Sequence, residues 1–103
     1  MATIMQMHWP EASEEQYEQV RRTANWEGNR PDGAKLHVVG FSDDGMRILD
    51  IWESSEAFQT WFEQRIGPAV QEAGIEGQPE VLMFPLHGVW APAFGGEEQT
   101  ATP

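Results

Sequence analysis

The stretch MRILDIWESSEAF, residues 46–58, contains a strand followed directly by a helix and decides the fold. Side chains alternate from Met46 to Trp52, as expected of a half-buried strand. The run Ser-Ser-Glu that follows is typical of a helix start. The helix then places Phe58, Trp61, Phe62 and Ile66 on one side. One carboxylate, Asp50, lies inside this otherwise apolar strand.

On the N-terminal side of this stretch the sequence predicts a hairpin. Asp44-Gly45 is a favoured two-residue loop, and it would join a strand over 35–42 to a strand over 46–53. Further upstream, residues 3–9 alternate as a strand that Pro10 ends. Ser13 and Gln16 form a capping box, so a helix should begin at Ser13 and end near Asn25. A loop rich in Gly, Pro and Asn covers 26–34.

On the C-terminal side the helix that begins at Ser54 or Ser55 should be interrupted at Gly67-Pro68, because proline lacks the helical N–H donor. A short continuation ends at Gly74 as the C-terminal cap. A last strand is expected over 78–90, and a disordered polar tail over 91–103. The chain is therefore expected to form a single domain over 1–90.

The order β-α-β-β-α-β predicts an α+β, ferredoxin-like domain with a four-stranded antiparallel sheet. An Asp44-Gly45 loop would pair Phe41 with Ile48 and His37 with Trp52, which separates two faces of the sheet. The small aliphatic face is expected under the helices, and it contains Leu36, Val38, Leu49 and Ile51. The aromatic face should be covered by a second copy of the chain, because so apolar a surface would not stay in water. It contains His37, Val39, Phe41, Ile48, Asp50 and Trp52.

Composition excludes several classes of partner and site. The net charge of −11 would repel nucleic acids and anionic lipid surfaces, so neither is expected as a partner. The absence of cysteine excludes disulfides and thiolate metal sites. No apolar run is long enough to span a membrane, and the N-terminus lacks the pattern of a signal peptide, so a cytoplasmic location is expected.

The chain resembles the dimeric α/β-barrel superfamily, in the branch of the antibiotic-biosynthesis monooxygenase-like proteins. The resemblance covers about residues 1 to 90, and it is closest to small members with no assigned activity. It is carried by Pro31-Asp32-Gly33, by residues 37–40 and 49–54, by Phe58, and by Gly67-Pro68-Ala69 and Phe84-Pro85-Leu86-His87. It implies a homodimer in which two sheets pack face to face into a barrel, with small organic ligands bound inside.

Members of that superfamily oxidise polyaromatic substrates without a cofactor, degrade haem or cyclise polyketides. The haem-degrading members hold iron through a helix histidine, and the helix that follows Ser54 contains none. No glycine-rich nucleotide loop and no metal-binding histidine spacing occurs in the sequence. We therefore expect neither a cofactor nor a metal.

His37 and Asp50 are the candidate catalytic residues, because a carboxylate beside an imidazole fixes its tautomer and makes it a better base. The alternative is that Asp50 pairs with a polar group and His37 stacks on Trp52 in a purely structural role. Candidate ligand-binding residues are Trp26, Phe41, Trp52, His8 and His87. His8 and His87 are not expected to meet within one subunit.

Two functions follow as hypotheses. The first is a cofactor-independent, monooxygenase-like or cyclase-like enzyme that acts on an aromatic or polyketide-like molecule. The second is a non-catalytic homodimer that binds or sequesters an apolar small molecule.

Overall fold

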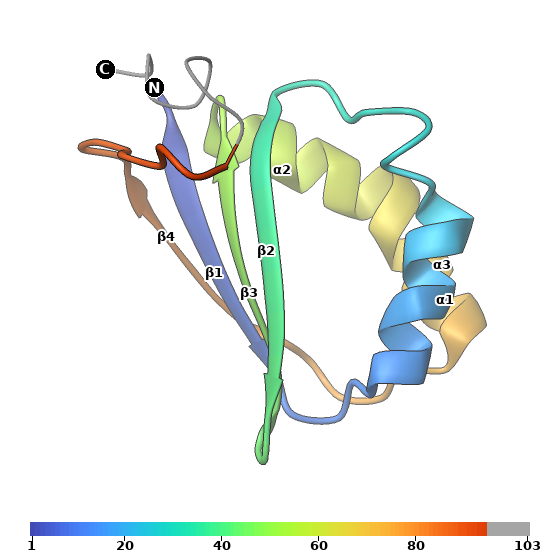
Figure 1. Cartoon of the computed structure of the whole chain (residues 1–103). Helices are drawn as coiled ribbons and strands as arrows, with labels where there is room; N and C mark the ends of the chain where they lie inside the picture. The colour runs from blue at the N-terminus through green and yellow to red at the C-terminus, as the bar shows by residue number, and fades with distance from the viewer. Residues whose placement is uncertain (95–103) are drawn as a thin grey trace.

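The computed structural model describes residues 1–94, and it consists of one sheet with all its helices on one face (Figure 1). The elements, in chain order, are β1 (Thr3–Trp9), α1 (Glu14–Ala24), β2 (Ala34–Ser42), β3 (Gly45–Trp52), α2 (Ser55–Trp61), the π-helical turn η1 (Phe62–Ile66), α3 (Gly67–Ala73) and β4 (Glu80–Pro85). The strands are antiparallel in the order β2-β3-β1-β4. The predicted ferredoxin-like fold is confirmed.

The helix starts follow the predicted capping chemistry. The Ser13 side chain accepts from the backbone of Gln16, and the Gln16 side chain bonds back to the Ser13 backbone, so the capping box is present. Ser54 caps α2 in the same way, by accepting from the Ala57 N–H. These caps fix where each helix leaves the sheet.

The core lies between the sheet and the helices. Its buried residues on the sheet come from alternate positions of β1 and β3: Met5, Met7, Trp9, Met46 and Trp52. Tyr17 from α1 and Phe58 from α2 pack onto them. A second cluster joins α1 to η1 and α3 through Val20, Ala24, Ile66 and Ala69.

The hairpin turn lies one residue earlier than predicted. Ser42 pairs with Gly45, so Asp43 and Asp44 form the loop, and His37 pairs with Asp50 rather than with Trp52. Gly45 starts the strand with φ 112°, and a Cβ there would lie 2.5 Å from Pro10 Cα. Because Pro10 approaches so closely, only glycine fits at position 45, the first residue of the strand. The change moves each partner by two residues, so the predicted grouping of residues into two faces is unaffected.

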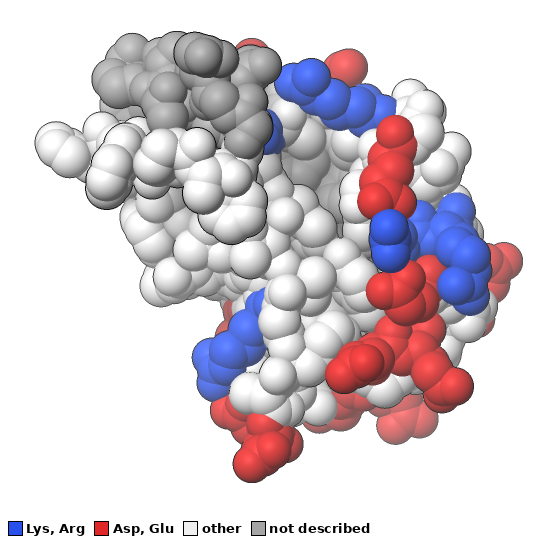
Figure 2. All heavy atoms as spheres, viewed as in Figure 1, with Lys and Arg blue, Asp and Glu red and all other residues white. Residues whose placement is uncertain are grey.

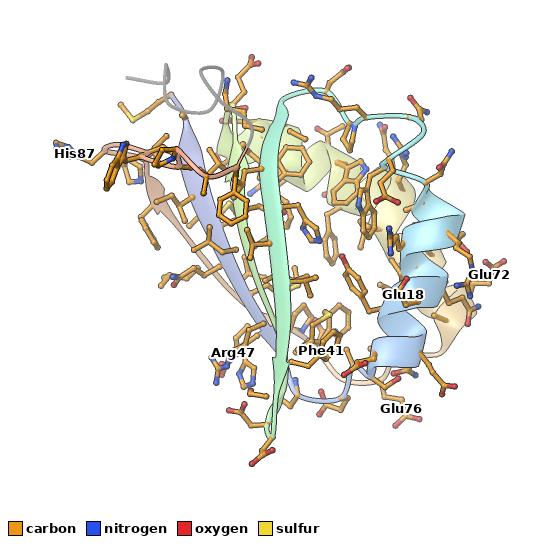
Figure 3. All side chains as sticks on the ribbon, viewed as in Figure 1. Glu18, Phe41, Arg47, Glu72, Glu76 and His87 are labelled. Carbon is orange, nitrogen blue, oxygen red and sulfur yellow. The ribbon has the colours of Figure 1, made fainter. Side chains whose placement is uncertain are left out.

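The assignment of those faces was wrong. His37, Asp50 and Trp52 share the face of Met5, which lies under the helices, so this face cannot be the dimer interface. Figure 3 shows Phe41 on the helix side of β2 and Arg47 on the opposite side of the sheet. The large side chains of this face, such as Met5, Trp9 and Trp52, bury more apolar surface under the helices than Val38 or Leu49 of the other face would.

The opposite surface of the sheet, here called the open face, consists of Ile4, Gln6, Leu36, Val38, Leu49, Ile51, Leu82 and Phe84. Val38 is 53% exposed and Leu82 59% exposed. No helix within residues 1–94 covers this face (Figure 1).

Two element boundaries also differ from prediction. Gly67-Pro68 does not interrupt the helix, because the wider turn of η1 lets the Gly67 N–H donate to Phe62 O and places Pro68 where α3 begins. The strand predicted over 78–90 ends at Pro85, which pairs with Thr3, the first residue of β1. The last backbone bond there joins Leu86 N to Ala2 O at 2.9 Å.

The tail predicted as disordered over 91–103 lies outside the described residues from 95 onward. No helix within residues 1–94 is both long and apolar enough to cross a bilayer.

Candidate functional site

His37 and Asp50 face each other across β2 and β3 as directly paired residues. His37 Nδ1 lies 2.7 Å from Asp50 Oδ1. The second carboxylate oxygen accepts a hydrogen bond from Trp52 Nε1–H at 3.0 Å. Asp50 is only 3% exposed, so its carboxylate oxygens find their hydrogen-bond partners in the protein rather than in water. The predicted loop had paired His37 with Trp52, so the observed register brings His37 and Asp50 closer together than expected.

The other imidazole nitrogen of His37 is also engaged. The Tyr17 hydroxyl lies 2.7 Å from His37 Nε2, and the two rings are stacked with planes 7° apart. Because the Asp50 carboxylate accepts from Nδ1–H, Nε2 is left to accept from the Tyr17 hydroxyl. Burial raises the pKa of Tyr17 to about 12, which keeps the phenol protonated as that donor.

Local structure brings these groups together from three elements. The capping box at Ser13 starts α1 so that Tyr17 lies on its inner side with Val20 and Ala24. The alternation of β2 and β3 places His37 and Asp50 on that same side. The result is a continuous chain of hydrogen bonds from Tyr17 to Trp52.

The loop that carries Trp26 is fixed by Arg65. Its guanidinium donates to the carbonyl oxygens of Ala24, Asn25 and Asn29, at 2.9 Å for the last. The same loop begins with Asn25 in the left-handed conformation, φ 51°. Trp26 is thereby held with its ring centroid 5.3 Å from that of His37.

A cavity of about 500 Å³ opens beside His37 and Asp50, within the usual size range of ligand pockets. Trp26, Trp52 and Trp61 provide its aromatic walls. The ring centroid of Trp61 lies 5.9 Å from that of Trp26 and 5.3 Å from that of Trp52. Figure 2 shows the hollow between the sheet and the helices near the top of the view.

A smaller cavity of about 50 Å³ lies deeper in the core and shares Trp26, His37 and Trp61 with the first. Tyr17 lines only this inner cavity. His37 therefore stands between the two spaces, with 28% of its side chain exposed.

Trp61 contributes a polar atom without a partner. Its Nε1 is buried and makes no hydrogen bond within residues 1–94. Buried indole N–H groups usually have an acceptor, so the unpaired N–H of Trp61 needs a structural reason. An acceptor on a bound molecule would supply one, because Trp61 lines both cavities.

The remaining predicted site residues are distributed unevenly. Trp26 and Trp52 line the large cavity with His37 and Asp50. Phe41 shares their face but packs edge-on against Tyr17, with ring centroids 6.0 Å apart, and lies outside the cavity wall.

The other two histidines lie elsewhere. His8 is on the opposite surface of the sheet, where its Nε2 lies 2.8 Å from Asp44 O. His87 follows β4 and is exposed, far from Phe41 in Figure 3. In the part of the chain described here, no group of three or more His, Asp or Glu side chains could hold a metal ion.

Sequence reasoning missed Tyr17, Arg30, Lys35 and Trp61 as members of this region. The sequence pattern placed Trp61 on one side of its helix with Phe58 and Phe62, and it assigned no role in the site to Tyr17. The signal that could have identified Tyr17 is its hydroxyl, which needs a partner when the ring is buried.

Comparisons with known proteins support the fold. No family model matches the sequence, and no curated protein is significantly similar to it. A cofactor-independent oxygenase from Streptomyces nogalater is 15% identical, with a TM-score of 0.61 over 85% of this chain and 94% of that chain. A dimeric ferredoxin-like protein of unknown function from Thermobifida fusca is 13% identical, with a TM-score of 0.55 over 84% and 92%.

A protein from Nitrosomonas europaea, provisionally described as an antibiotic biosynthesis monooxygenase, is 8% identical, with a TM-score of 0.57 over 87% and 100% of the two chains. These structural neighbours match the superfamily that the sequence resembles. At such identities the likeness establishes a shared fold, and the chemistry of this chain has to be argued from its own site.

Proposed function

We propose that the protein binds an aromatic or polyketide-like molecule in the 500 Å³ cavity and acts on it as a cofactor-independent, monooxygenase-like enzyme. The observation that carries the proposal is that an imidazole oriented by a buried carboxylate lies on the wall of a cavity lined by three indole rings. The rings suit a flat aromatic ligand, and the imidazole suits removal of a proton from it.

His37 would act as the base and Asp50 would stabilise the imidazolium that forms. A carbanion or enolate made in this way can itself reduce O₂, so the substrate supplies the electrons. A molecule with an acidic C–H group between aromatic rings meets this requirement. Because the Tyr17 hydroxyl occupies Nε2 and Tyr17 does not line the large cavity, the hydroxyl must move aside before Nε2 can accept a proton from the substrate.

We also propose that the protein forms a homodimer. Its interface would be the open face rather than the aromatic face expected from the sequence. The Thermobifida fusca neighbour is described as dimeric. The exposed Val38 and Leu82 would be removed from water by a second copy of the sheet. A cytoplasmic location stays a prediction.

A second candidate is non-catalytic binding of an apolar molecule. The observation that favours it is that both nitrogens of His37 already have partners, at 2.7 Å each. Histidines held in this way can be purely structural. Ligand binding without turnover would be its result.

Anthrone is a suitable probe, because its CH₂ group lies between two aromatic rings. Reaction with O₂ would give anthraquinone and water: one oxygen atom becomes the new carbonyl, and the other leaves with both hydrogens of the CH₂ group. Turnover is measured as O₂ uptake and anthraquinone absorbance, and binding as quenching of tryptophan fluorescence. We expect His37→Ala to lower the rate by about 100-fold, the lower end of general base contributions.

His87→Ala is the matched control, because His87 lies outside the cavity wall. It should leave the rate unchanged. Binding without turnover in the unmodified protein would favour the second candidate. Absence of both would contradict the assignment of the cavity as a ligand site.

A further inference from the structure

The six basic residues of this acidic chain differ in whether they have partners in the protein. Arg21 pairs with Glu18 and Glu27, at 3.0 and 2.8 Å, and Arg47 pairs with Asp44 at 2.7 Å. Arg65 is bound to backbone carbonyls. Arg22 is exposed on α1. The other two, Arg30 and Lys35, both line the 500 Å³ cavity.

Neither of these two cations is neutralised by the described part of the protein. Within residues 1–94 no carboxylate forms an ion pair with Arg30 or Lys35. Asp50 is the one carboxylate on the cavity wall, and both of its oxygens already accept hydrogen bonds. In Figure 2 blue side chains border the hollow at the top and red atoms border it on the right, while most red side chains gather lower in the view.

Both residues are placed by local backbone structure. Arg30 Nε donates to Ala34 O at 3.2 Å, and no other hydrogen bond of its guanidinium is formed within residues 1–94. Lys35 is the extra residue of a β-bulge, because Ala34 pairs with Trp52 and Leu36 with Ile51. Bulges redirect a side chain, and this one lies at the cavity.

We propose that the ligand of this cavity is an aromatic anion, such as an aromatic carboxylate or an ionised phenol. The inference rests on the proposed function, which places an aromatic molecule in the 500 Å³ cavity. It adds that this molecule carries a negative charge. A chain with net charge −11 repels anions from most of its surface. On the cavity wall two cations without an ion pair in residues 1–94 outnumber the single carboxylate of Asp50, and this excess of positive charge would attract an anion. The indoles of Trp26, Trp52 and Trp61 would contact its rings.

Two fluorescent probes test the charge separately from the rings. 1-Anilinonaphthalene-8-sulfonate is an aromatic anion, and N-phenyl-1-naphthylamine has the same ring skeleton without the sulfonate. Each is titrated into the full chain at low salt. The sulfonate probe should bind more tightly, and its affinity should fall as salt is added.

The decisive variant is Arg30→Gln combined with Lys35→Gln. Affinity for the anionic probe should fall about tenfold, at roughly threefold for each exposed charge. Affinity for the neutral probe should not change. Arg22→Gln removes one charge from α1, away from the cavity wall, and should alter neither affinity. Arg30→Lys keeps the charge without the fork and should retain binding of the anion, which separates charge from folding.

An anionic probe that binds the double variant as well as the unmodified protein would overturn this inference and leave the cavity as a site for neutral aromatics. An equal loss in Arg22→Gln would also overturn it, because the effect would then belong to overall charge. If neither probe binds the unmodified protein, the proposed function itself fails, and the inference falls with it.

Discussion

The hydroxyl of Tyr17 lies 2.7 Å from Nε2 of His37, on the opposite side of the ring from Asp50. A helix residue and two strand residues are thus joined through one imidazole. In the neutral imidazole this bond favours the tautomer with its proton on Nδ1, and it joins α1 to the sheet. It also means that Nε2 of the proposed base is unavailable to a substrate until the Tyr17 hydroxyl moves away.

Tyr17 can be observed directly, because it is the one tyrosine of the chain. Burial raises its pKa to about 12 from the ordinary value near 10. The phenolate absorbs near 295 nm, so a spectrophotometric titration should show a single transition near pH 12 in the folded protein and near pH 10 in urea. Circular dichroism at each pH confirms that the protein is still folded.

The same shift has a consequence for stability. A raised folded-state pKa means that the unfolded chain loses the proton first, between pH 10 and about pH 12. The contribution of Tyr17 is complete below pH 10 and is lost as the pH rises through 12. Tyr17→Phe should remove this part of the alkaline decline, and a folded-state transition near pH 10 would contradict the arrangement.

Asp50→Asn should disturb the tautomer of His37 more than the fold. The amide would keep its oxygen toward Trp52 Nε1–H and turn its NH₂ toward His37 Nδ1, so the ring proton would move to Nε2. We expect a loss of about 1–2 kcal/mol in unfolding free energy, because a charge-assisted bond is replaced by a neutral one. Urea denaturation measures the loss, and ¹⁵N chemical shifts of the imidazole report the tautomer.

Asp43→Asn is the control for that variant, because Asp43 is exposed in the hairpin loop. Its effect should stay within about 0.5 kcal/mol. An unchanged imidazole spectrum in Asp50→Asn would show that Asp50 does not set the tautomer.

Two tryptophans differ both in hydrogen bonding and in burial, because Trp52 is 2% exposed and Trp61 is only partly buried. Trp52 Nε1 donates to Asp50, whereas Trp61 Nε1 is buried without a partner in the described residues. Trp52→Phe should therefore cost about 2–3 kcal/mol of unfolding free energy, and Trp61→Phe less than about 1 kcal/mol. Thermal or urea unfolding compares them, and equal losses would mean that the bond to Asp50 contributes nothing.

If two copies of the chain pair through the open face, a single substitution there should convert the dimer to a monomer. Val38→Asp places a charge where a second sheet is proposed to pack, so the molecular mass from light scattering should fall from that of a dimer to that of a monomer. Thr60→Asp adds the same charge on the exposed side of α2 and should leave the dimer intact. A monomer in the unmodified protein at micromolar concentration would refute the proposed interface.

The sequence was sufficient to predict the order of the elements and the residues that share each face of the sheet. Alternation in β2 and β3 fixes which residues share a face, but it does not show which face the helices cover, because both faces contain apolar side chains. β1 held the missing signal: Met5, Met7 and Trp9 alternate with Gln6 and His8. Pairing β1 with β3 would have placed Asp50 beside Met5 and therefore in the core.

The candidate site was predictable only in part, because a strand pattern places side chains within a sheet and not against a helix or a loop. His37, Asp50 and Trp52 come from adjacent strands, and the pattern grouped them. Tyr17 and Trp61 reach the site from helices, and Arg30 from a loop whose course depends on the contacts of Arg65 with backbone carbonyls. Such contacts leave no periodic trace in the sequence.

The π-helical turn at Phe62–Ile66 has a consequence for how relatives of this chain should be aligned. A π turn is equivalent to one residue inserted into an α-helix. Deleting one residue from 62–66 would restore regular winding but rotate everything after it by about 100°. Ala69, which is 1% exposed, would then leave its contact with α1. Homologues without the turn should therefore show a single-residue gap here and a different set of small residues facing α1.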